Sequence, residues 1–85
     1  DPVWGEERIR EFLDLQPPAG ENADHHKLLK AYQSMREEDF ADFVRFFVAD
    51  NGDVNAKNND GQTVADVIAK HRLSEPYLNA IKQHA

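Results

Sequence analysis

Apolar residues recur at helical spacing in five separate stretches of this chain. Within each stretch the spacing of three and four residues places the apolar side chains on one face of a helix. The pattern predicts an all-α fold of about five short helices. Their apolar faces are formed by Ile9, Phe12 and Leu13; by Leu28, Leu29, Tyr32 and Met35; by Phe40, Phe43, Val44, Phe47 and Val48; by Val64, Val67 and Ile68; and by Tyr77, Leu78 and Ile81.

Residues that stop and start helices separate these stretches. Pro17 and Pro18 end a first helix over residues 4–15 and begin a linker, because paired prolines cannot continue a helix. Asn22 or Asp24 is then expected to cap a second helix that runs to Met35. Residues 36–39 contain three acids, which favour a new helix N-terminus and so predict a break before the third helix.

A polar loop over residues 52–63 joins the third helix to the fourth. Asn51 and Gly52, where the third helix gives way to the loop, tolerate a positive φ and therefore end that helix at Asp50. Residues 58–61, Asn-Asn-Asp-Gly, form a dense turn signal. Thr63 is expected to cap a fourth helix over 63–70 with Asp66 as its partner. Ser74 is expected to cap the fifth helix, with Pro76 in its first turn.

The sequence of this loop resembles that of the ankyrin repeat. Residues 53–57, Asp-Val-Asn-Ala-Lys, and residues 60–63, Asp-Gly-Gln-Thr, carry the resemblance, which is clearest over 43–72. The length of 85 residues predicts one domain, 1–85. The resemblance implies that an N-terminal capping helix and linker (1–22) precede two helix-loop-helix units, 23–62 and 63–85. Aligning His26 with Thr63 relates the units by an offset of 37 residues, longer than the roughly 33 of a regular repeat.

This resemblance departs from the family's pattern at one position that matters for packing. Residues 64–66, Val-Ala-Asp, stand where the family usually has Pro-Leu-His, so the histidine that ties adjacent repeat loops together is replaced by Asp66. A regular extended array is therefore not expected. The chain also resembles small proteobacterial proteins of this length, which implies no function.

Ankyrin-like proteins mostly bind other proteins, so the resemblance implies a protein-protein interaction module or adaptor. Its partner would be another protein, and neither a nucleic acid nor a membrane is expected. The resemblance places the binding surface at the loop tip and the exposed face of the helix after it. The partner-binding candidates are Lys57, Asn58, Asn59, Asp60, Gln62, Asp66 and Lys70.

Charge suggests an alternative function. The formal net charge is −6, and residues 1–62 hold 14 acidic against 7 basic side chains, whereas residues 63–85 hold 2 against 3. A negative surface disfavours binding to nucleic acid or to anionic membranes, which require clustered Lys and Arg. It is compatible with an acidic mimic or antagonist of a basic partner, which would act through Glu37, Glu38, Asp39 and Asp42.

Composition also bears on location and assembly. The chain has no cysteine, which suits a reducing cytoplasm, and no apolar run approaches the roughly 18 residues of a membrane span. We therefore expect a cytoplasmic protein, although the sequence begins at Asp1 and leaves room for a preceding segment. A monomer or weak homodimer is expected, with Leu73, Tyr77 and Leu78 at an exposed apolar end. Phe46 lies off the main apolar stripe and either packs against a neighbouring helix or is exposed to a partner.

Candidate chemistry for catalysis is sparse. Adjacent His25 and His26 would point in different directions from a helix, so they cannot chelate one ion from one face. We expect no enzyme activity, no metal site and no cofactor. The third and least favoured function is an enzyme or metal protein that uses the histidines, which are His25, His26, His71 and His84.

Overall fold

Helices make up the ordered elements of this protein. The computed structural model describes residues 5–72 and 74–84, within which no strand occurs, and the all-α prediction is confirmed. The predicted roles of Trp4 in the first helix and of Leu73 at the exposed end lie outside the described residues. The elements are α1 (Glu6–Arg10), the 3₁₀ helix η1 (Glu11–Asp14), α2 (Ala23–Ser34), α3 (Glu37–Ala49), α4 (Val64–Ile68) and α5 (Glu75–Lys82).

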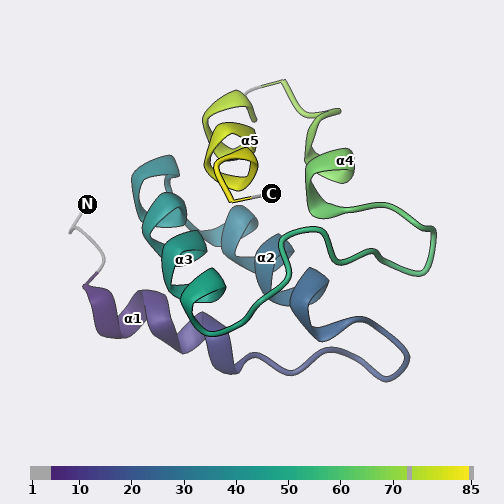
Figure 1. Ribbon diagram of the computed structural model, residues 1–85, viewed down its shortest axis with the longest axis horizontal. Coiled ribbons are helices and arrows are strands. Elements are labelled where there is room, and N and C mark those ends of the chain that lie inside the picture. The colour runs from purple at the N-terminus through teal and green to yellow at the C-terminus, as the bar shows by residue number, and fades with distance from the viewer. Residues whose placement is uncertain (1–4, 73, 85) are drawn as a thin grey trace.

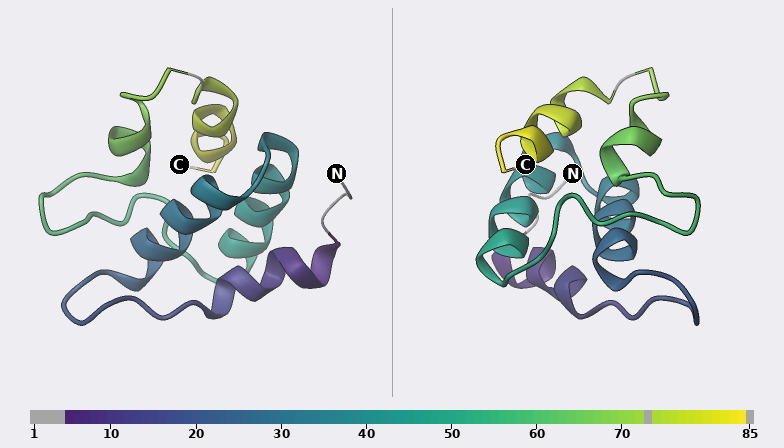
Figure 2. Two further views of the ribbon diagram at one scale, coloured as in Figure 1. Left: turned by 180° about the vertical axis from the view of Figure 1, so that it is seen from behind. Right: turned by 45° about the vertical axis from the view of Figure 1, so that its right-hand side comes forward.

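The helices stack in three levels (Figure 1). The middle level is the pair α2 and α3, which contact each other. On one side of this pair, α1 lies against α3 and η1 lies against α2; on the other side, α5 lies against α3 and α4 lies against α2. The two views of Figure 2 show the same order, with the C-terminal helices and α1 on opposite sides of the middle pair. Both α2 and α3 are therefore covered on two sides.

Three phenylalanine rings on α3 form the centre of the core. Phe40, Phe43 and Phe47 are buried, and their rings stack in sequence with centroid separations of 6.4 Å and 5.8 Å. Ile9 of α1 is buried in the same core, and Phe12 meets Phe43 edge to face. The first helix thus docks onto α2 and α3 through the apolar face that its sequence pattern predicts.

Most helix ends follow their local sequence. The Asn22 side chain accepts a hydrogen bond from the backbone of His25, so Asn22 and not Asp24 caps α2. Met35 and Arg36 are extended, which confirms the predicted break. Asn51 adopts a φ of +65° after α3, as the end of that helix requires. None of the described helices has the length and apolar character to span a membrane.

Three expectations about helix ends were wrong. The first helix is α-helical only to Arg10 and then tightens into η1, and α4 ends at Ile68 instead of Lys70 because the chain turns there. Ser74 does not cap α5 with its side chain. Its hydroxyl donates to the carbonyl of His71, and its backbone is helical instead of extended. Pro76 does lie in the first turn of α5, where a missing N–H costs little.

Gly52 allows the chain to pass close to the Phe47 ring as it leaves α3. A Cβ atom built on Gly52 would lie 2.6 Å from the ring of Phe47. That ring is fully buried, so it has no free space in which to move. The Gly52 N–H also donates to the carbonyl of Phe47 at 2.8 Å. Only glycine therefore lets the loop cross directly over the end of the phenylalanine stack.

We expect Gly52→Ala to destabilise the fold by about 1–3 kcal/mol, because the added methyl group overpacks the Phe47 site. Urea denaturation followed by circular dichroism measures the change. Gly5→Ala is the matched control, since a Cβ at Gly5 meets no atom within 4 Å. Equal stability of the two variants would show that the Phe47 ring yields.

Candidate functional site

A hairpin over residues 57–63 projects beyond the helices between α3 and α4 (Figure 1). Lys57 and Thr63 form an isolated antiparallel bridge at its base. The Asn58 N–H donates to the carbonyl of Gln62 at 2.8 Å, and the Gly61 N–H donates to the carbonyl of Asn58 at 3.0 Å. Gly61 has a φ of +76°, a conformation that favours glycine. The turn predicted at residues 58–61 is thus present.

The Asn58 side chain holds this turn together. Its Oδ1 accepts hydrogen bonds from the backbone N–H groups of Asp60, at 2.9 Å, and of Gln62, at 3.0 Å. Asparagine is common in turns because it can make such local bonds. Asn58 is therefore structurally engaged, and any contact it makes with a partner would involve its remaining polar atoms.

Both ends of the loop are tied to helices. The Asp24 Oδ2 atom, on α2, accepts a hydrogen bond from the Asp53 N–H at 2.9 Å. At the other end Thr63 and Asp66 form the predicted capping box, in which each side chain accepts from the other's backbone N–H at 3.1 Å. Val54 and Ala56 are buried beneath the loop. The hairpin is consequently held by α2, by α4 and by the core.

The structure divides the seven predicted partner-binding residues into two groups. Five share the hairpin, whereas Asp66 is on α4 and Lys70 follows its C-terminus. Asn58 and Gln62 are half-buried and bonded within the turn. The exposed members are Lys57, Asn59, Asp60, Asp66 and Lys70. Of these, only Asp66 uses its side chain in a hydrogen bond or ion pair within the described residues.

The burial of His25 is a feature that the sequence pattern does not predict. His25 lies in the N-terminal turn of α2, yet the residue is only 6% exposed. Burial lowers the pKa of His25 below its ordinary value of 6.5, although the Glu21 carboxylate and the Gln62 backbone favour the protonated ring. The nearby His26 also lowers this pKa. The spacing Asn22-x-x-His25 places the ring in the first turn of α2, where it faces the hairpin instead of water.

The His25 Nε2 atom is buried and makes no hydrogen bond within the described residues. A surface cavity of about 220 Å³ lies beside this ring, between the start of α2 and the hairpin tip. Since the two walls come from segments more than 30 residues apart, the sequence pattern does not reveal the cavity. Its lining residues are Glu21, Asn22, His25, Asn58, Asn59 and Asp60.

The other histidines lie elsewhere. The Nδ1 atom of His71 is 2.7 Å from the hydroxyl of Tyr32, and the two rings stack. His26 is half-buried and His84 is exposed near the C-terminus. Among the described residues no group of three or more His, Cys, Asp or Glu side chains is arranged to hold a metal ion.

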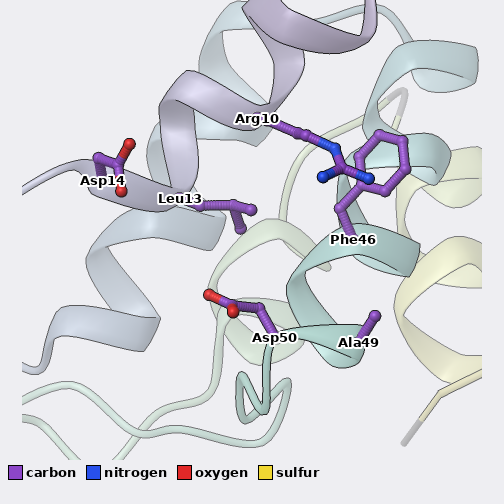
Figure 3. Close-up of a pocket in the computed structure, with 6 residues that line it drawn as sticks. All are labelled: Arg10, Leu13, Asp14, Phe46, Ala49 and Asp50. Atoms are coloured by element: carbon purple, nitrogen blue, oxygen red, sulfur yellow. The ribbon is translucent and has the colours of Figure 1, made fainter.

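A second cavity of about 400 Å³ is lined by residues of α1, of η1 and of the C-terminal end of α3 (Figure 3). The guanidinium of Arg10 covers the Phe46 ring at 4.5 Å from its centroid. Phe46 is half-buried and packs against Arg10 of α1, so of the two predicted alternatives the structure shows the one in which Phe46 packs against a neighbouring helix. Leu13, Asp14, Ala49 and Asp50 complete the walls. The mixture of both charge signs with apolar groups favours no one class of ligand.

The acidic group at the start of α3 is smaller than its sequence suggests. Asp39 is buried, and Asp42 forms an ion pair with Arg45. Only Glu37 and Glu38 of the four predicted acids are exposed and without an ion pair in the described part of the chain.

At the predicted apolar end, Tyr77 and Leu78 are half-buried, and the Tyr77 hydroxyl donates to the carbonyl of Met35 at 2.7 Å.

No protein-family model, curated protein or solved structure matches this chain. The ankyrin resemblance therefore stays a prediction. The helix caps Asn22 and Thr63 lie 41 positions apart, so matching the two caps would give an offset of 41 residues instead of the predicted 37. In this register His25 would correspond to Asp66.

The low pKa of His25 predicts a pH-dependent stability. In the unfolded chain His25 takes up a proton near pH 6.5, whereas the folded ring stays neutral to lower pH. This difference makes the free energy of unfolding fall as pH decreases from about 7.5 through the folded pKa. We expect His25→Leu to remove the contribution of His25 to the slope of the free energy of unfolding against pH. Urea denaturation at several pH values compares the two chains, and equal slopes between pH 7.5 and 5.5 would contradict the burial of a neutral ring.

Proposed function

We propose that this chain is a protein-binding module that contacts its partner through the hairpin over residues 57–63 and the neighbouring face of α4. The observation that carries the proposal is a hairpin whose backbone is held by hydrogen bonds while several of its exposed side chains make none with other described residues. Lys57, Asn59 and Asp60 make no side-chain hydrogen bond or ion pair within the described residues. Exposed polar groups on a fixed backbone are available to a partner at little entropic cost.

Fixing of the backbone supports this proposal. The bridge between Lys57 and Thr63, the two bonds to Asn58 Oδ1 and the bond from Asp53 to Asp24 constrain the hairpin from both sides. Loops positioned by a rigid scaffold commonly carry binding residues. Asn58 and Asp66 serve mainly to shape the surface, and Lys57, Asn59, Asp60 and Lys70 are its contact residues.

The stacking of the helices is consistent with the ankyrin resemblance. The first helices of the two units, α2 and α4, contact each other, as do their second helices, α3 and α5. In the register that matches the two caps, His25 lies next to the Gln62 backbone of the following loop. This is the place at which the family uses a histidine to tie adjacent loops. The arrangement supports a short ankyrin-like module with α1 as its cap.

Other features of the proposal follow from composition. The module acts in the cytoplasm, as a monomer or weak homodimer, and its partner is another protein. A bacterial origin is in keeping with the resemblance to small proteobacterial proteins. No observation favours the acidic mimic or a histidine-based reaction over this function.

Partner capture from a proteobacterial lysate tests the proposal. We expect the wild-type chain to retain a partner that the double variant Asn59→Ala/Asp60→Ala binds at least about tenfold more weakly, since a few contact residues carry most binding energy. Asn58 stays unchanged so that the turn is preserved. Titration calorimetry with the identified partner then measures the change in affinity.

Glu37→Ala/Glu38→Ala is the matched control, because it removes two exposed polar side chains from a different surface. It should bind like the wild type. A partner lost by this control and kept by the hairpin variant would contradict the proposal and support the acidic surface instead.

A further inference from the structure

The small cavity beside His25 has the size and lining of a site for one side chain. At about 220 Å³ it is smaller than the roughly 300–1,000 Å³ typical of sites for drug-sized ligands. All six lining residues are polar or charged, and they come from residues 21–25 and from the hairpin tip at 58–60. Both segments project on the same side of the molecule in Figure 1.

The charges around the cavity favour a cation. Glu21 and Asp60 supply two carboxylates, and no Lys or Arg is among the lining residues. Neither carboxylate makes a side-chain hydrogen bond or ion pair within the described residues. An anionic ligand would be repelled, whereas a cation would find two acceptors that the fold leaves available.

His25 adds a buried ring nitrogen. Its Nε2 atom is buried and makes no hydrogen bond within the described residues, and the residue is 6% exposed. A neutral imidazole has one donor nitrogen and one acceptor nitrogen. A buried polar atom without a hydrogen-bond partner is unfavourable, so a ligand that bonds to Nε2 would relieve this cost.

These acceptors suit an organic cation better than a metal ion. The described His, Asp and Glu side chains include no group of three arranged to hold a metal. A guanidinium instead carries five N–H donors in a plane and bonds several acceptors at once. Asn22 and Asn59 also line the cavity and add polar side chains to it.

We propose that this cavity receives one arginine side chain of the partner protein, whose guanidinium lies between Glu21 and Asp60 and donates to His25. The inference rests on the proposed function and names the chemistry that the hairpin tip recognises. An arginine in this position would contact the α2 turn and the hairpin together. The partner is therefore a protein that presents an exposed arginine.

Two small probes that differ in charge test the cavity itself. ¹⁵N and imidazole NMR spectra of the full chain are recorded with N-acetyl-arginine methylamide and with the corresponding citrulline amide, which has nearly the same shape without the charge. We expect the arginine probe, at millimolar concentration, to shift the His25 ring and the amides of 58–60. The citrulline probe should shift them several-fold less. Equal shifts from both probes, or none, would overturn the proposal.

Charge-neutralising variants locate the binding. Glu21→Gln/Asp60→Asn should weaken binding of the arginine probe by roughly fivefold, since each exposed ion pair contributes modestly to affinity. Glu7→Gln is the control, because it removes an exposed carboxylate on α1 that is outside the cavity. Unchanged affinity in the double variant, with a folded ¹⁵N spectrum, would contradict the assignment.

The two proposals fail in different ways. If the hairpin variant Asn59→Ala/Asp60→Ala loses the captured partner while the arginine probe binds nowhere, the protein-binding function stands and the arginine site is wrong. If the probe binds beside His25 while the captured partner is unaffected by the hairpin variant, the site stands and the proposed route of partner binding is wrong.

Discussion

The burial of three phenylalanine rings along α3 is the constraint on which the other elements depend. Phe40, Phe43 and Phe47 are nearly fully removed from water, and α3 contacts α1, α2 and α5. Burial of each ring contributes a large apolar term to folding. Because the stack ends at Phe47, the direction in which the chain leaves α3 is fixed by the same rings.

The position of the hairpin follows from that exit. Gly52 crosses Phe47 without a side chain, and the chain then bonds to α2 through Asp53 and Asp24. Buried Val54 and Ala56 anchor the segment that leads into the hairpin. The tip is thereby brought beside the N-terminal turn of α2, which forms the cavity at His25. A binding surface made from two distant segments is thus a consequence of core packing.

The sequence predicts the features that depend on local structure. The helix faces, the break at Met35 and Arg36, the turn at residues 58–61 and the capping box of Thr63 require only neighbours within a few positions. The burial of His25 and Asp39 and the bond between Asp24 and Asp53 depend on packing across 29 or more residues or between helices. Ser74 was predicted to cap α5, but its hydroxyl donates to the His71 carbonyl instead, and the local sequence does not reveal which of the two bonds forms. The exposed hairpin residues were predicted from a resemblance, but the cavity needed the fold.

The central claim is that the hairpin tip is a fixed surface before any partner arrives. Backbone ¹⁵N relaxation of the amides from Asn58 to Gly61 tests it most directly. The hydrogen bonds around Asn58 predict order parameters near the roughly 0.85 of rigid backbone. Values below about 0.6, typical of a flexible loop, would contradict a preformed binding surface and the cavity that depends on it.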